Sequence, residues 1–159
     1  MPGNVFTDLL SLKIIEDPFI KNNEEKVQWV SKKDWEYKTI FKLSKEILNK
    51  ENIEINFEGL DTYAKIYLNG NYQLDTDNAF QKYSIPVKNL LEEENELKII
   101  FKNSIEIENN KANNNPYQLP EGNRIYTRKA QFQNGWDWGP KLNTTGIWKN
   151  ITLSAWNEY

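Results

Sequence analysis

The sequence predicts an all-β protein with the architecture of an antiparallel β-sandwich. From Asp34 onward, most of the chain consists of short runs in which apolar and polar residues alternate, as in strands that bury one face. Turn residues separate these runs, and the pair Asn69-Gly70 is the strongest hairpin signal among them. Aromatic residues make up 13% of the chain although all hydrophobic residues make up only 38%, so large rings have to build the core.

The first part of the chain is expected to form a turn, a short helix and a strand. The turn lies at Pro2-Gly3, and the helix is predicted over residues 7–14 with Thr7 or Asp8 as its N-terminal cap. The first strand is predicted where residues alternate with mostly polar neighbours, at Trp35, Tyr37, Thr39, Phe41 and Leu43.

The middle of the chain is predicted to form a strand followed by a hairpin. The strand alternates at Ile53, Ile55 and Phe57. The hairpin places on one face the residues Ala64, Ile66 and Leu68. It turns at Asn69-Gly70, because both residues tolerate the positive φ of a type I′ turn, and it returns over residues 72–76.

Two further strands are predicted in the second half of the chain. One alternates at Leu97, Ile99 and Phe101, and the last covers residues 148–155. Residues 111–120 are expected to be a loop, because their Asn cluster and two prolines can neither fill a core nor sustain a ladder. No internal repeat or long linker is visible, so residues 1–159 are predicted to form a single domain.

Composition excludes several classes of function. The 20 basic and 23 acidic residues are mixed along the chain, with a formal net charge of -3, which argues against a nucleic-acid partner. The chain has no His and no Cys, which excludes histidine-based triads, His- or Cys-bound zinc, thiol nucleophiles and disulfides. We expect no metal and no cofactor. No apolar run is long enough to span a membrane. No signal peptide is visible, so the compartment stays open with the cytoplasm slightly favoured.

The most informative segment covers residues 124–148. There Trp136 and Trp138 flank Asp137, and Gly135 and Gly139-Pro140 lie on either side, which indicates a shaped loop rather than a strand. In one interpretation the two rings fill the end of the core and the carboxylate accepts from backbone amides. In the other the loop binds a sugar, since indole rings stack on pyranose faces and a carboxylate accepts from neighbouring hydroxyls.

The stretch RKAQFQNGWDWGP, followed by TTGIWKNITL, resembles the segment that closes the N-terminal sugar-binding domain of β-mannosidases in glycoside hydrolase family 2. Earlier blocks resemble that domain in the same order, namely PGNVFTDLL, KVQWVSKKDWEYKTIF, FEGLDTYAKIYLNG, DNAFQKYSIPVKNLL and ENELKIIFKNS. The resemblance covers nearly the whole chain. It implies a jelly-roll sandwich similar to galactose-binding domains.

The resemblance also implies roles for four residues. Trp136 and Asp137 match residues that reach into the active site of a catalytic barrel and contact the terminal mannose of an oligosaccharide. Trp138 and Arg128 match residues that support this loop, and the planar charged fork of Arg128 suits that role. The two catalytic glutamates of the family lie on the barrel, which this chain lacks. We therefore expect no catalytic residue here and no activity from the chain alone.

One departure from the family bears on assembly. In the family a further strand precedes the Pro-Gly turn, and here the chain begins at Met1. We therefore expect the leading strand to be missing and a sheet edge to be unpaired, which allows a homodimer through that edge. Two alternatives to a domain of a β-mannosidase stay open. One is a free-standing, lectin-like module that binds glycans, and the other is a scaffold that only docks the remaining enzyme domains.

Overall fold

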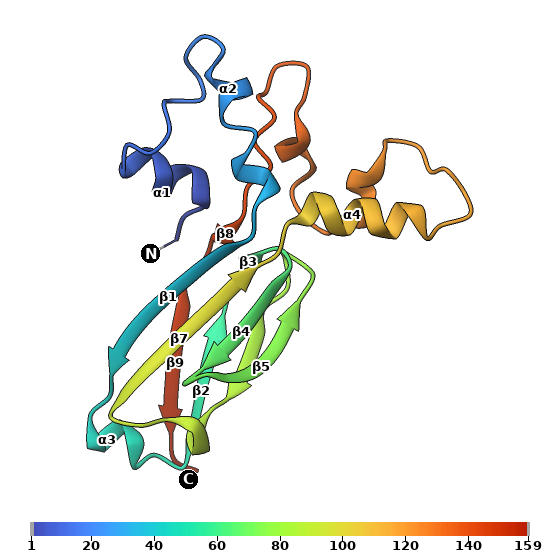
Figure 1. Cartoon of the computed structure of the whole chain (residues 1–159). Coiled ribbons are helices and arrows are strands. Elements are labelled where there is room, and N and C mark those ends of the chain that lie inside the picture. The colour runs from blue at the N-terminus through green and yellow to red at the C-terminus, as the bar shows by residue number, and fades with distance from the viewer. Residues whose placement is uncertain (1, 159) are drawn as a thin grey trace.

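The computed structural model describes residues 2–158, and more of them lie in strands of antiparallel sheets than in helices (Figure 1). The strands are β1 (Trp35–Lys42), β2 (Asn52–Phe57), β3 (Leu60–Asp61), β4 (Ala64–Leu68), β5 (Asn71–Thr76), β6 (Tyr83–Pro86), β7 (Glu94–Phe101), β8 (Gly146–Ile147) and β9 (Ile151–Trp156). The α-helices are α1 (Val5–Ser11), α2 (Asn23–Lys26), α3 (Lys45–Leu48) and α4 (Ser104–Asn113). Single 3-10 turns are η1 (Val30–Lys32), η2 (Lys88–Leu90), η3 (Asn123–Tyr126) and η4 (Gln131–Asn134).

Two sheets form the sandwich. One has four strands in the order β1-β7-β4-β5, and the other has three strands in the order β6-β2-β9. A short pair, β3 with β8, continues toward the end of the sandwich where α1, α2 and α4 lie (Figure 1). The predicted all-β antiparallel class is therefore confirmed. None of the helices between residues 2 and 158 is long and apolar enough to cross a membrane.

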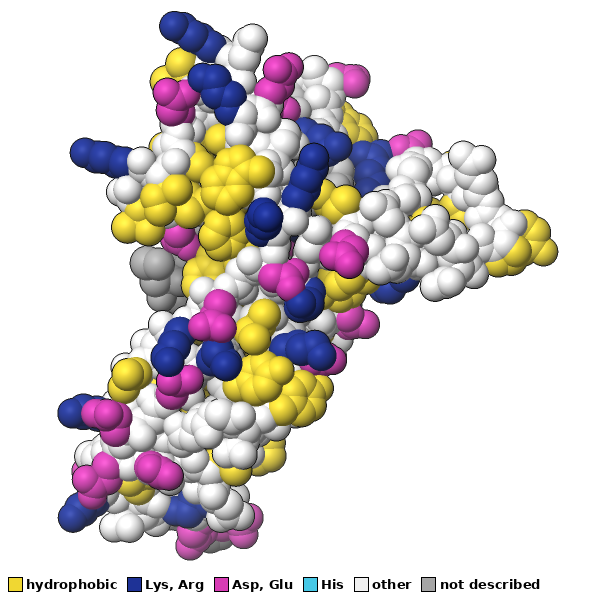
Figure 2. Space-filling model, in the orientation of Figure 1, with side chains coloured by type: hydrophobic (Ala, Val, Ile, Leu, Met, Phe, Trp, Pro, Cys, Tyr) yellow, Lys and Arg dark blue, Asp and Glu magenta, His cyan; other side chains and the backbone are white. Residues whose placement is uncertain are grey.

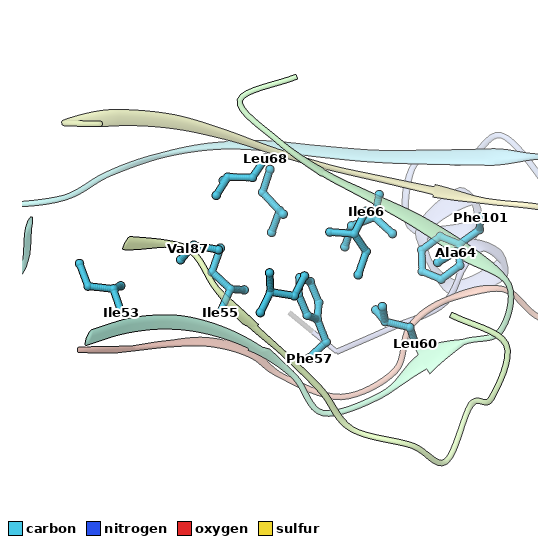
Figure 3. Packing of buried hydrophobic residues seen from close by; sticks show 12 residues of the cluster. Ile53, Ile55, Phe57, Leu60, Ala64, Ile66, Leu68, Val87 and Phe101 are labelled. Atoms are coloured by element: carbon cyan, nitrogen blue, oxygen red, sulfur yellow. The ribbon is translucent and has the colours of Figure 1, made fainter. Parts of the chain in front are cut away.

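The core lies between the two sheets and follows from the alternation in the sequence. In β2 the residues Ile53, Ile55 and Phe57 are buried, while the residues between them are only half-buried. The same period of two holds in β4 and β7, so that inward side chains of both sheets meet (Figure 3). Full burial of one such aliphatic or aromatic side chain contributes about 1.5–3 kcal/mol.

The hairpin between β4 and β5 turns as the sequence predicts. Asn69 has a φ of 50° and Gly70 a φ of 78°, which is the pair of positive angles that a type I′ turn requires. The Asn69 side chain also forms hydrogen bonds. Its amide donates to the Leu90 carbonyl at 2.8 Å and to the Asn95 side-chain oxygen at 2.9 Å. The turn is thereby tied to the neighbouring loop before β7.

The first predicted helix is wrong in its bounds and in its cap. It spans Val5–Ser11 rather than residues 7–14, and its cap is Asn4, whose side-chain oxygen accepts from the Phe6 and Thr7 amides at 3.0 and 3.2 Å. Thr7 supplies the other half of a capping box, because its hydroxyl accepts from the Asn4 amide at 3.2 Å. Thr7 therefore assists the cap from inside the first turn.

Two other predictions need correction. The first residues of the predicted loop at 111–120 belong to α4, a mostly polar helix that buries only Ser104 and Glu108. Asn103 caps this helix by accepting from the Ile105 amide at 3.0 Å. The last strand begins at Ile151 rather than at residue 148, so that Trp148 lies in the connection before it.

A second hydrophobic cluster covers the loop end of the sandwich. Its buried members come from α1 and the segment before β1, and they are Val5, Phe6, Leu9, Ile15, Val27 and Val30. Backbone bonds hold this cluster beside β8, since the Gly3 amide donates to the Ile147 carbonyl at 2.7 Å and the Val5 amide to the Thr145 carbonyl at 2.8 Å. In the view of Figure 2, hydrophobic side chains gather near this end, whereas charges of both signs are mixed over the lower part of the sandwich.

Candidate functional site

Residues 124–148 cross the loop end of the sandwich, and Trp136, Asp137 and Trp138 lie at their tip. Trp136 and Gly139 exchange two backbone hydrogen bonds, of 3.1 and 3.2 Å, so that Asp137 and Trp138 occupy the middle of a tight turn. Gly135 precedes this turn with a φ of 93°, a conformation that glycine adopts without strain. The predicted loop is therefore confirmed.

The side chains of the tip face outward. Trp136 is 55% exposed and Trp138 is 83% exposed, and Asp137 is exposed as well. The indole N–H groups of Trp136 and Trp138 have no hydrogen-bond partner within residues 2–158. The same holds for both carboxylate oxygens of Asp137. The interpretation in which these rings fill the core and the carboxylate accepts from backbone amides is therefore wrong.

Two other tryptophans show the contrast. The indole N–H of Trp35 donates to the Val30 carbonyl, and that of Trp148 donates to the Ala79 carbonyl, each at 2.9 Å. The Trp148 ring also meets Phe80 edge to face, with the ring centroids 6.5 Å apart. These two rings are only partly exposed, and their N–H groups are hydrogen-bonded within the domain. Trp136 and Trp138 have no such hydrogen bond.

Beside the tip lies a groove of about 680 Å³ whose walls are mostly apolar and include several aromatic rings. Its exposed or half-buried rings are Phe19, Phe80, Phe132, Trp136, Trp138 and Trp148. Five polar side chains also line it, namely Asn4 and Thr7 of the α1 capping box, and Asp61, Gln133 and Thr144. The Asp61 carboxylate accepts from the Gln133 amide and from the Thr144 hydroxyl, both at 3.0 Å. The polar groups of the groove therefore bind one another.

Below the tip lies a buried ion pair that sequence reasoning missed. The Lys129 side chain has no exposed surface, and its ammonium nitrogen lies 3.3 Å from an Asp61 carboxylate oxygen. Burial lowers the pKa of Lys129, and the negative charge of Asp61 opposes that shift. Lys129 also donates to the Asn143 side chain at 2.8 Å and to the Thr144 carbonyl at 2.6 Å. The one sequence signal was its place inside the RKAQFQNGWDWGP stretch, next to Arg128.

Arg128 and Trp138 were predicted to support the loop. The Arg128 carbonyl accepts from the Ala79 amide at 2.9 Å, which ties its backbone to the segment after β5. Its side chain is exposed, and it forms no ion pair or hydrogen bond with residues 2–158. The supporting role of these two side chains stays a prediction. The contacts that hold the base of the loop come from Lys129 and Asp61 instead.

A carboxyl group close to this base is also buried. Glu108 of α4 is 4% exposed, and one of its oxygens has no hydrogen-bond partner. Burial raises the pKa of Glu108, while Thr127 and Lys129 act in the opposite direction. The described residues contain no group of three or more Asp or Glu side chains that could hold a metal ion.

Comparison with known proteins identifies the domain. A family model described as "Glycosyl hydrolase 2 galactose-binding domain-like" matches residues 1–149. The beta-mannosidase of Mus musculus is 31% identical over an alignment that covers 99% of this chain and 19% of that protein. Beta-mannosidase B of Thermothelomyces thermophilus is 37% identical with the same two coverages. The chain thus spans about a fifth of the length of these relatives.

Solved structures agree with the sequence relatives. The crystal structure of beta-D-mannosidase from Dictyoglomus thermophilum superposes with a TM-score of 0.95 at 45% identity, over 99% of this chain and 20% of that one. A beta-glycosidase from Bacteroides vulgatus matches with a TM-score of 0.50 at 16% identity, over 76% of this chain and 12% of that one, which is a likeness of fold. The chain therefore belongs to glycosyl hydrolase family 2, as a galactose-binding-like domain of the β-mannosidase type.

Proposed function

We propose that this chain is the non-catalytic carbohydrate-binding domain of a β-mannosidase. In this proposal, Trp136 and Asp137 complete the mannose subsite of a catalytic barrel that lies outside the chain. The observation that carries it is the tip of the loop, whose two indole N–H groups and carboxylate have no hydrogen-bond partner within residues 2–158. In our proposal these exposed groups exchange their contacts with water for contacts with the sugar.

The chemistry of the tip suits the end of a mannoside chain. The apolar CH face of a pyranose can stack on the Trp136 ring, which is 55% exposed. The Asp137 carboxylate has two oxygens that can accept from neighbouring hydroxyl groups, and hydrogen bonds to a charged acceptor are the stronger kind. An aromatic platform beside a few fixed polar groups is the usual composition of a ligand site.

The relatives support the proposal at the level of the whole protein. Proteins called beta-mannosidase match 99% of this chain, yet the chain spans only 19–20% of their lengths. In our proposal the catalytic machinery lies in the part of such an enzyme that this domain does not cover. The chain also has no His, and no pair of carboxyl groups in it is recognisable as a retaining glycosidase pair.

The free-standing lectin is the weaker alternative. A lectin needs polar groups in its own site that are free to bind sugar hydroxyls, but Asp61, Gln133 and Thr144 in the groove already bind one another. The pure docking scaffold shares one observation with our proposal, because an exposed aromatic groove suits burial against another domain. The two differ in Asp137, which a docking face does not need and a mannose subsite does.

The experiment that tests the proposal uses a chimera in which this chain replaces the matching segment of the Dictyoglomus thermophilum beta-D-mannosidase. Asp137→Ala should lower kcat/KM for an aryl β-mannoside by about tenfold to a few hundredfold, because unpaired hydroxyls in a closed site cost roughly 1–3 kcal/mol each. The matched control is Asp77→Ala, another exposed aspartate, which should leave kcat/KM unchanged.

The same set of proteins separates the alternatives. An active chimera that keeps its kcat/KM after Asp137→Ala contradicts the proposal and favours the docking scaffold. Titration of the isolated chain with mannose should show weak binding, since only one wall of the subsite is present. Tight binding of a glycan by the isolated chain would instead support the lectin. The isolated chain should not hydrolyse the aryl mannoside.

We also propose that the isolated chain forms a homodimer through β9. This strand ends its sheet, its outer edge pairs with no other strand among residues 2–158, and its sequence ITLSAW has no charge or proline to prevent edge pairing. A groove of about 490 Å³ opens between β9 and β1. Two copies of β9 paired antiparallel about Leu153 would place their inward residues opposite one another, namely Ile151, Leu153 and Ala155.

Sedimentation over a range of concentrations measures this association. The wild-type chain should sediment as a dimer, and Thr152→Lys, which puts a charge on the outward face of the free edge, should leave it monomeric. The control is Gln73→Lys in β5, an edge strand of the other sheet that does not line this groove, which should leave the dimer intact. A wild-type chain that is monomeric at its highest soluble concentration would exclude the dimer.

A further inference from the structure

The Lys129–Asp61 pair joins parts of the loop that are distant in sequence. Lys129 lies at the start of the loop, and its ammonium group donates to Asn143 and to Thr144 at the end of the loop, at 2.8 and 2.6 Å. It also pairs with the Asp61 carboxylate at 3.3 Å. One buried side chain therefore connects both stems of the loop to each other and to the sandwich.

Asp61 supplies the rigid side of this arrangement. It belongs to β3 and pairs in register with Gly146 of β8, the strand into which the loop continues. Its carboxylate accepts from the Gln133 amide and from the Thr144 hydroxyl at 3.0 Å each, and from the Thr62 hydroxyl. Asp61 thus contacts both stems of the loop while its own backbone is fixed in a sheet.

Further hydrogen bonds close the stems just below the tip. The Asn143 amide donates to the Asn134 side-chain oxygen at 2.8 Å, and the Thr144 backbone amide donates to the Gln133 side-chain oxygen at 3.2 Å. Ser31, from the segment before β1, donates to the Asn143 carbonyl at 2.9 Å. The tip therefore rises from a closed polar base that contacts three separate parts of the chain.

We propose that Asp61 and Lys129 are positioning residues, which fix where Trp136 and Asp137 stand relative to the sandwich. The inference rests on the proposed function of the tip, because it assigns these two residues a part in holding the mannose subsite. Their physical role is to favour one conformation of the loop over others. A buried ion pair adds little net stability compared with apolar residues, but removing one partner leaves a buried charge unpaired. A displacement of about 1 Å at a reacting site can cost on the order of a hundredfold in rate.

The competing explanation is that the pair serves global stability alone. In that case its loss loosens the whole domain to the same extent, and the tip is affected only as much as the core. The two explanations differ in where the backbone opens, which hydrogen exchange measures amide by amide. The amides of Trp136 and Gly139 report on the tip, since they form its two backbone hydrogen bonds. The amides of Ile66 and Ile99, buried in β4 and β7, report on the core.

The test uses the 159-residue chain itself with two variants of the pair. Lys129→Met removes the ammonium group but leaves Asp61 charged, so this variant can lose its fold for a trivial reason. The double variant Asp61→Asn with Lys129→Met removes both charges and keeps an amide that can bind Gln133 and Thr144. Lys88→Met is the matched control, because Lys88 also donates from a partly buried position, to the Leu48 carbonyl, but donates to no residue of the loop.

In the double variant, the Trp136 and Gly139 amides should exchange about tenfold faster while Ile66 and Ile99 keep their rates. The control variant should leave the tip amides unchanged. The inference is overturned if the tip amides keep their wild-type rates, or if tip and core amides accelerate together.

The enzymatic arm separates this inference from the proposed function. In the chimera, the double variant should lower kcat/KM about tenfold, mostly through kcat, because a misplaced tip no longer fits the transition state. If Asp137→Ala has no effect on the chimera, the proposed function fails, but the exchange rates still decide whether the pair positions the tip. If Asp137→Ala has its expected effect and the double variant keeps full activity, the positioning role fails alone.

Discussion

At the hairpin end of the sandwich both the oxygen and the nitrogen of the Asn95 side chain form hydrogen bonds within the chain, whereas at the loop end the Asp137 carboxylate and the indole N–H groups beside it have no partner within residues 2–158. Asn95 is 1% exposed. Its oxygen accepts from the Asn69 side chain and from the Glu92 amide, and its nitrogen donates to the Glu92 carbonyl at 2.6 Å. The loop end has a hydrogen-bonded base around Lys129, in which the buried Asn134 side-chain nitrogen alone lacks a partner among the described residues, and the tip is exposed above this base.

This comparison separates the polar groups that the fold needs from those that it leaves on the surface. The Asn95 network and the Lys129 base are buried polar groups, and such groups need their hydrogen bonds for the domain to fold. The tip is exposed, so folding does not need its side chains. Substitutions at the two ends should therefore have different consequences, and the following three measurements can break or sharpen the contrast.

The largest effect is expected at the hairpin end. Asn95→Ala should lower the free energy of unfolding by about 3 kcal/mol, because it leaves Asn69 and both backbone groups of Glu92 without their partner. Chemical denaturation of the isolated chain measures this. The control is Asn71→Ala, since Asn71 is exposed and its side chain donates a single hydrogen bond, of 3.3 Å, to the Asn69 carbonyl. Equal losses from the two variants would remove the contrast at this end.

Two tryptophans at the loop end give the next effect. Trp148→Ala should cost about 2 kcal/mol, because the ring is packed against Phe80 and its N–H bonds to Ala79. Trp136→Ala should change stability by less than about 0.5 kcal/mol, as substitutions of exposed residues usually do. Thermal melting of the two variants compares them directly. A large loss on removing Trp136 would show that the tip is part of the fold, against our proposal.

The smallest effect is a pH dependence at Glu108. Burial raises the pKa of this carboxyl group in the folded chain above its ordinary value of 4.5, with Thr127, Lys129, Lys111 and Lys141 opposing the shift. Between these two pKa values the folded chain binds more protons than the unfolded chain. Stability attributable to Glu108 should therefore be highest below the ordinary pKa and should fall as the pH rises to the folded value.

Glu108→Gln should remove this part of the pH dependence, so that the variant loses less stability than the wild type between acidic and neutral pH. Urea unfolding at a series of pH values gives the two profiles. Glu106→Gln is the control, because Glu106 lies on the same helix but is exposed. Profiles of identical slope for wild type and Glu108→Gln would show that the carboxyl group titrates normally.

The longer strands and the loop could be predicted from sequence because their signals are local, whereas the short strands β3, β6 and β8 were not predicted. Ile53, Ile55 and Phe57 alternate within a few residues, and the Asn69-Gly70 turn depends on two neighbours. The helix cap was misplaced because Asn4 and Thr7 are both good capping residues, and only the backbone decides between them. The helix α4 was missed because a helix that buries so few residues shows no apolar periodicity.

The base of the loop could not be found in this way. Asp61 and Lys129 meet only in the fold, and each looks like an ordinary charged surface residue among many in the sequence. A buried lysine is recognised by the residues packed around it, and these are distant from it in the sequence. By contrast, Trp136 and Asp137 were noticed because of composition and resemblance, and the structure adds that their side chains are exposed.

The closed base of the loop also matters for how the domain can diversify. Because the stems are joined at Gln133–Thr144 and Asn134–Asn143, the residues between them form a segment whose ends are already fixed in space. Lengthening or exchanging such a segment adds little entropic cost, since its closure is secured by the stems. Residues 135–142 are therefore a suitable place for grafting, where the tip can be exchanged while the sandwich is kept as it is.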